Sequence, residues 1–180
     1  MKQIDVTIQG ISPLLMHAYP MVPVEAQEKL PPDEQAERAA YRAPDTGRLF
    51  IPGVNIQRAL ISAATYSKGK GRASLQKPVA AGVLVSPQRV DLGVSDFAVD
   101  SRPVVMPATR GRVLRHRPRL DEWRARFTIE YDPALLKEDE VRRVVDDCGQ
   151  RVGLLDFRPE RKGPFGRFMV TAWSNGNGGK

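Results

Sequence analysis

The sequence has few of the residues that build disulfides and metal sites. Its 180 residues include one cysteine and two histidines, with no Cys-x-x-Cys and no His-x-x-x-His spacing. These absences exclude an internal disulfide framework and argue against structural zinc. Cys148 lies in an apolar pattern of helical spacing, which predicts a buried thiol rather than a nucleophile. We therefore expect no metal and no other cofactor.

The phosphate-binding loop of nucleotide hydrolases is also missing. Gly69 and Gly71 lie in SKGKGR, with no Gly-Lys-Ser/Thr after them and no strand–loop–helix context. The adjacent acids at 121–122 and 146–147 are interpreted as solvated charges rather than Mg²⁺ ligands. Nucleotide hydrolysis therefore has no support.

Long apolar runs are absent as well. No stretch approaches the roughly 18 apolar residues that a membrane-spanning helix needs. The first ten residues, MKQIDVTIQG, alternate in polarity instead of forming the apolar core of a signal peptide. We expect a cytoplasmic protein without a membrane partner. With 41% hydrophobic residues, the chain can bury the core of one domain.

Charge is the property that the sequence has in excess. Lysine and arginine number 28 against 21 acids, which gives a net charge of +7. A basic balance favours polyanionic partners, nucleic acid first among them.

The periodicity of apolar residues predicts an α+β domain. Strands with period-two or continuous apolar patterns are expected at 3–9, 80–87, 123–131 and 165–173, and helices at 54–66 and about 139–152. Asp132 and Pro133 predict that the second helical region begins there. The order strand, helix, two or more strands, helix, strand is that of a ferredoxin-like βαββαβ domain. Its antiparallel sheet has two helices on one face and leaves the other face free.

The remaining segments are expected to be additions to this domain, which spans 1–173. A Pro-, Glu- and Ala-rich insertion at about 18–48 contains a short helix near 33–41, and a basic β-ribbon lies at about 98–118. The glycine- and asparagine-rich end, 174–180, is expected to be disordered.

Three basic segments are candidates for phosphate binding. Residues 110–126 contain seven arginines against two acids, and arginine holds phosphates bidentately and stacks on bases. On a strand, Arg115, Arg117 and Arg119 share one face. The loop 151–170 joins basic residues to glycines that admit a phosphate to backbone amides. The loop 67–77 is expected to be flexible and basic and to close over the backbone of a bound strand. The alternative interpretations are that the charges only keep these segments solvated and that the glycines only form turns. Trp123 is more often a core residue than a base-stacking one.

His17 is the one weak candidate for catalysis. It lies in ISPLLMHAYP, directly after the first predicted strand. A histidine there can act as general base on a ribose 2′-hydroxyl. A lone histidine is more often structural, and the two interpretations stay open.

Three segments together resemble the RAMP superfamily, the ferredoxin-like proteins of CRISPR effector complexes and CRISPR-RNA processing. ISPLLMH (11–17) resembles the opening of the backbone-type subunits. FIPGVNIQRAL (50–60) resembles their helix start, with Asn55 in place of the usual Ser and Arg58 where Gly is common. VGLLDFRPERKGPFGRF (152–168) resembles their glycine-rich loop, from which Leu155–Asp156 departs.

The resemblance implies protomers that polymerise along a guide RNA or another single strand. It also implies phosphate contacts near the helix start and the glycine-rich loop, and a ribbon that projects between bases. A chain of 180 residues is short for a CRISPR backbone subunit. The sequence therefore supports equally well a stand-alone phage or mobile-element relative that coats single-stranded DNA or RNA.

We therefore expect a non-catalytic, oligomeric protein that binds single-stranded RNA or DNA. The alternatives are a metal-independent endoribonuclease that uses His17 and a structural protein that binds an acidic protein partner. The residues expected to contact nucleic acid are Asn55, Arg58, Lys68, Lys70, Arg72, Arg110, Arg112, Arg115, Arg117, Arg119, Arg158, Arg161, Lys162, Gly163 and Gly166.

Overall fold

A computed structural model describes residues 1–19, 21, 23–69, 71, 73–106 and 109–176. Its main sheet has four strands, in the spatial order β4 (Val83–Ser86), β8 (Arg124–Tyr131), β1 (Lys2–Gly10) and β9 (Phe168–Asn175). All neighbouring strands are antiparallel. This order confirms the predicted ferredoxin-like topology, because the chain runs from β1 through α3 (Gly53–Ala63), β4, β8 and α5 (Glu138–Asp147) to β9.

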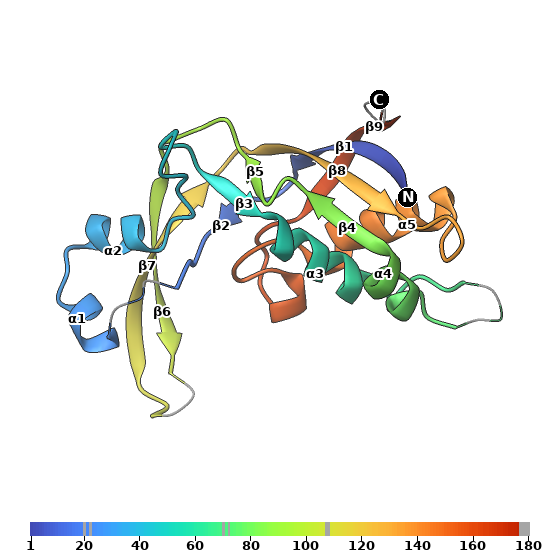
Figure 1. Ribbon diagram of the computed structural model, residues 1–180. Helices are drawn as coiled ribbons and strands as arrows, with labels where there is room; N and C mark the ends of the chain where they lie inside the picture. Colours follow the sequence, from blue (N-terminus) through green and yellow to red (C-terminus); the bar gives the residue numbers. More distant parts are fainter. Residues whose placement is uncertain (20, 22, 70, 72, 107–108, 177–180) are drawn as a thin grey trace.

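The core lies between this sheet and its two principal helices (Figure 1). Alternate residues of the central strands point into it, and fully burying one large apolar side chain stabilises a fold by about 1.5–3 kcal/mol. The opposite face of the sheet is polar and carries Asp5, Gln9, Arg124, Arg126 and Thr128. The buried set includes Ile4, Val6, Ile8, Ile56, Leu60, Phe127, Ile129, Val141, Val144 and Val145.

A second layer of structure lies beside the main sheet. A three-stranded sheet joins β2 (Leu14–Leu15), β7 (Arg112–Leu120) and β6 (Ala98–Val105), and β6 and β7 form a long hairpin. The short helices α1 (Val24–Glu28) and α2 (Pro32–Arg38) belong to the segment inserted after β2, and α2 packs against β7 and β6 (Figure 1). The small strands β3 (Phe50–Pro52) and β5 (Arg89–Asp91) pair antiparallel.

Two predicted core residues are confirmed. Cys148 is fully buried, and burial raises the pKa of its thiol far above the ordinary value. Trp123 is 4% exposed, and its indole nitrogen donates to the carbonyl of Ser12 at 2.8 Å. Gly10 allows this packing, since a Cβ there would lie 2.2 Å from the indole nitrogen.

The structure corrects three boundaries. Residues 80–82 belong to helix α4 (Gln76–Gly82) and not to a strand, because Ala80 and Ala81 favour a helix and Pro78 is tolerated in its first turn. Asp132 does not cap α5: its carboxylate accepts the amide of Ala134, and the helix begins at Glu138. Strand β9 extends into the expected tail, since Asn175 and Ser174 pair with β1. Residues 177–180 lie outside the described part.

No helix in the described residues is long and apolar enough to cross a membrane.

Gly149 tests the packing of the helical layer on β9. It lies in the π-helical turn η2 (Cys148–Val152), and a Cβ there would come 2.2 Å from the carbonyl oxygen of Phe168. Gly149→Ala should lower the free energy of unfolding by about 1–3 kcal/mol, measured by urea denaturation. Gly111→Ala is the control and should stay within about 0.5 kcal/mol, because among the described residues its Cβ meets only the hydroxyl of Thr109, at 3.2 Å. Equal stabilities of the two variants would contradict this packing.

Candidate functional site

A polar pocket of about 190 Å³ lies where four segments of the chain meet. Its walls are the first turn of α3, the stretch that follows β2, the stretch that follows α2, and the loop between η2 and β9. The residues around the pocket are His17, Tyr41, Asn55, Leu155, Asp156 and Arg158. Of the residues predicted from the sequence, it thus joins His17, Asn55 and Arg158.

The start of α3 is fixed by a close backbone contact. Gly53 donates its amide to the carbonyl of Gln88 at 2.8 Å, and a Cβ on Gly53 would lie 2.7 Å from the carbonyl oxygen of Pro87. No described side chain caps this helix. Apart from the amide of Gly53, the first turn, which includes Asn55, thus has no side-chain cap, and the positive end of the helix dipole makes it a favourable place for an anion.

The glycines of the loop at 153–166 pack the chain against itself. A Cβ on Gly163 would lie 1.8 Å from the carbonyl oxygen of Phe157, and one on Gly166 would lie 2.1 Å from that of Leu154. Gly166 also has a positive φ of 72°, which favours glycine. The amide of Gly163 donates to the carbonyl of Arg158, and that of Gly166 to the carbonyl of Pro13. The expectation that these amides bind phosphate is therefore corrected: both are used within the protein.

Asp156 connects the loop to the hairpin and to His17. Its carboxylate accepts a hydrogen bond from Arg117 at 2.5 Å, and the same oxygen lies 3.6 Å from Nδ1 of His17. Burial by itself would raise the pKa of Asp156, but the neighbouring imidazole of His17 and the charge of Arg117 lower it to about 2. Asp156 is therefore ionised at neutral pH, and it orients both basic partners.

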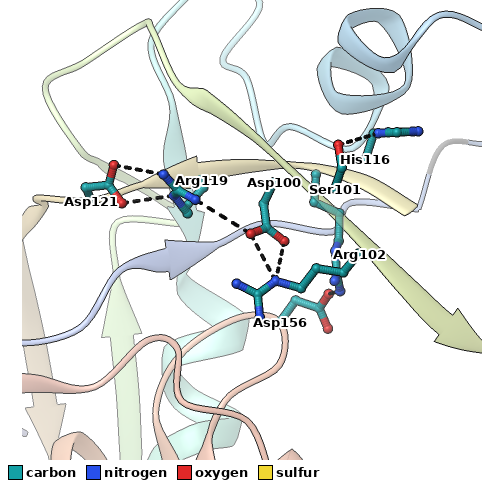
Figure 2. Close-up of polar contacts among 8 residues, drawn as sticks. Asp100, Ser101, Arg102, His116, Arg119, Asp121 and Asp156 are labelled. Carbon is teal, nitrogen blue, oxygen red and sulfur yellow. Dashed lines mark hydrogen bonds and ion pairs between the residues drawn. The ribbon is translucent and has the colours of Figure 1, made fainter. Parts of the chain in front are cut away.

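The base of the hairpin is an ion network (Figure 2). Asp100, only 4% exposed, accepts Nε of Arg102 at 2.8 Å and lies 3.7 Å from Arg119. Arg102 also lies over the ring of Phe165, 4.7 Å from its centroid. On the other face of the hairpin Ser101 contacts His116 at 2.7 Å. These contacts fix the hairpin against the loop.

This network changes the role of the predicted arginine strip. Arg117 is 5% exposed and is committed to Asp156, so it is not available for a phosphate. Arg119 is half-buried and pairs with Asp121 and Asp100. Arg115 is half-buried too, but no described carboxylate lies within 4 Å of it. Arg117 and Arg119 at the base of the hairpin therefore have structural roles. Among the described residues of the hairpin, the arginines that have no carboxylate partner are those nearer its tip.

The other predicted cations fall into three places. Arg58 is exposed on the same face of α3 as Asn55, and Arg161 and Lys162 are exposed in the loop after Arg158. Arg158 itself is held by Glu160 and by the carbonyl of Leu155. Arg110 and Arg112 are exposed near the tip of the hairpin, and Lys68 lies past the far end of α3. Lys70 and Arg72 lie outside the described residues.

Three residues of the pocket were not predicted from the sequence. Leu155 and Asp156 were noted only as a departure from the glycine-rich pattern, and the acidic charge of Asp156 amid basic residues was the available signal. Tyr41 carries no signal, because it belongs to the irregular inserted segment. Within the described ranges, no three His, Cys, Asp or Glu side chains are grouped to hold a metal ion.

Comparison with known proteins identifies the fold. No protein-family model matches the chain, and no curated protein matches it significantly in sequence. Sixty-two chains of solved structures match. One belongs to the cryo-EM structure of the Type III-B Cmr-beta bound to cognate target RNA, with a TM-score of 0.60 and 12% identity. The match covers 96% of this chain and 60% of the other, so the similarity shows a shared ferredoxin-like fold over part of a longer protein.

The bond between Asp156 and Arg117 predicts a pH-dependent stability. Because folding lowers the pKa of Asp156 to about 2, its contribution is complete above about pH 4 and is lost as the pH falls toward 2. Asp156→Asn should lower the free energy of unfolding by about 1–3 kcal/mol at pH 7, and this deficit should shrink below about pH 4. Urea denaturation across pH measures both effects.

Asp121→Asn is the matched control for this experiment. Asp121 pairs with Arg119, but its side chain is 60% exposed, so removal should cost at most about 1 kcal/mol. A deficit for Asp156→Asn that is no larger than that of the control would contradict the structural role of the pair.

Proposed function

We propose that this chain is a non-catalytic protein that binds single-stranded nucleic acid, RNA in the first place, and that copies of it coat the strand. The observation that carries the proposal is a group of exposed cations, Arg58 on α3 and Arg161 and Lys162 in the loop that also lines the pocket. Arg58, Arg161 and Lys162 have no described carboxylate within 4 Å, so their charge is available to a polyanion.

The shape of the site supports a strand rather than a small metabolite. The pocket of about 190 Å³ holds little more than one phosphate and its sugar, whereas Arg58 lies further along α3 and Arg161 and Lys162 lie in the loop after Arg158. Arg110 and Arg112 would meet the strand where it passes the ribbon. Sequence-tolerant binding of single strands uses such electrostatic tracks.

The shared fold supports the same proposal. The similar structure is that of the Type III-B Cmr-beta bound to cognate target RNA. We therefore propose that this chain assembles on RNA with other subunits, in the simplest form as repeated copies along one strand.

Salt-dependent binding tests the proposal. Fluorescence anisotropy with labelled single-stranded RNA, single-stranded DNA and duplex should show tighter binding of single strands, which weakens steeply with salt. The triple variant Arg58→Ala, Arg161→Ala, Lys162→Ala should weaken binding at low salt by about tenfold or more. Its slope of log affinity against log salt should fall by about 2, since each single-strand contact contributes about 0.7.

Arg126→Ala is the matched control for the triple variant. Arg126 is also exposed, at 74%, but it lies on the open face of the sheet and pairs with Asp5. Its loss should leave the affinity and the slope unchanged. No binding of any oligonucleotide at low salt would refute the proposal and favour an acidic protein as the partner.

One contact favours a second candidate, metal-independent cleavage of RNA through His17. Asp156 lies 3.6 Å from Nδ1 of His17, and a carboxylate at that nitrogen orients an imidazole whose other nitrogen can take a proton. Tyr41 and Asn55 lie beside it in the same pocket. A ribose 2′-hydroxyl placed there would give its proton to His17 and attack the adjacent phosphorus; the bond from phosphorus to the 5′-oxygen would break, that oxygen would take the proton from the imidazolium, and a 2′,3′-cyclic phosphate would remain.

A denaturing gel of the binding samples decides between the two functions. The binding proposal expects RNA to stay intact in EDTA after long incubation, and His17→Ala to bind as the wild type does. Cleavage that persists in EDTA and disappears in His17→Ala would instead establish the ribonuclease.

A further inference from the structure

An exposed aromatic side chain lies at the end of α3 away from the pocket. Tyr66, in the turn that follows the helix, is 52% exposed, and no described group forms a hydrogen bond with its hydroxyl. The residue is therefore not part of the core. Its backbone amide donates to the carbonyl of Ala63 at 2.9 Å, which fixes the turn that carries the ring.

A fixed guanidinium supports this ring. The Cζ atom of Arg151 lies 5.2 Å from the centroid of the Tyr66 ring. Arg151 is held by Asp147 at 3.1 Å, and Asp147 also accepts the hydroxyl of Ser67 at 2.8 Å. One face of the ring is thus covered by a planar cation, and Tyr66 still keeps half of its surface open to a ligand.

A cavity of about 350 Å³ adjoins the pair. Both of its carboxylates are neutralised, Asp147 by Arg151 and Asp146 by Arg142 at 3.1 Å. Arg143 lies 3.9 Å from Asp139, but this pair is long and exposed, so the three cations of the lining still outnumber its two carboxylates. Its lining consists of Tyr66, Ser67, Lys68, Arg143, Asp146, Asp147, Gln150 and Arg151.

The helix connects this cavity with the pocket at its other end. Asn55, Arg58 and Ser62 follow one face of α3 at spacings of three and four residues, and the turn with Tyr66 continues this row. At 1.5 Å per residue, Asn55 and the last helical residue, Ala63, are separated by about 12 Å along the axis, and Tyr66 follows three residues later. A strand bound at the start of α3 therefore reaches Tyr66 within a few nucleotides.

We propose that Tyr66, supported by Arg151, is a stacking platform for a nucleobase of the strand, with Lys68 and Arg143 beside it for the flanking phosphates. This inference rests on the proposed function, to which it adds the direction of the strand along α3. The platform takes any base, because every base offers a π-face and no described side chain reads a base edge by a fixed pair of hydrogen bonds.

Photo-crosslinking tests the platform directly. Single-stranded RNA with 5-iodouridine should crosslink on irradiation to Tyr66, which trypsin releases in the fragment 59–68, between Arg58 and Lys68. Tyr66→Ala should lose this crosslink and bind about tenfold more weakly, with an unchanged salt slope because stacking releases no counterion. Tyr66→Phe keeps the aromatic ring and should retain the affinity. Lys68→Ala should instead reduce the slope.

The outcomes separate this inference from the proposed function. Wild-type affinity in Tyr66→Ala, or a crosslink confined to other fragments, would overturn the platform and leave the salt-dependent binding of the wild type standing. Absence of binding by the wild type would overturn both. Circular dichroism and the thermal midpoint show whether Tyr66→Ala is folded, and weak binding by Tyr66→Phe with a native fold would also refute a stacking role.

Discussion

The carboxylate of Asp156 is the contact on which the arrangement of the site depends. It joins the loop before β9 to Arg117 of the hairpin and faces His17 after β2. Strand β1 alone cannot bring these segments together, because it ends at Gly10 and the chain then leaves the sheet. A partly buried ion pair adds to the apolar anchors of these segments, which are Leu154 and Leu155 in the loop and Leu120 at the end of β7.

The sequence predicted the frame of the molecule better than its site. The strands and helices of the ferredoxin-like order follow from apolar periodicity, which depends on neighbours within a few residues. The role of Arg117 depends on Asp156, 39 residues away. On the strand it resembles Arg115 and Arg119, and only the tertiary structure shows which of the three is buried. The glycines were expected at a phosphate, but they serve the close packing of the loop.

Helix α3 organises the basic surface. Its N-terminus borders the pocket with His17 and Asn55, Arg58 lies one turn further, and Tyr66 follows its C-terminal end. Position along one rigid element sets the spacing of these groups, so they do not depend on flexible loops for their register. The short helices of the insertion and the hairpin lie to one side of α3, away from α4 (Figure 1).

The length of the hairpin has a mechanical consequence. With strands of eight and nine residues, it extends about 26–30 Å at 3.3 Å per residue, so it acts as a lever whose pivot is its base. A rotation of a few degrees at the pivot displaces the tip by more than an ångström. The buried carboxylate of Asp100 and the guanidinium of Arg117 oppose each other across that pivot, in directly paired positions of β6 and β7. The stiffness of the hairpin tip is thus set by Asp100 and Arg117 at its base, where both are shielded from solvent, and not by contacts at the tip.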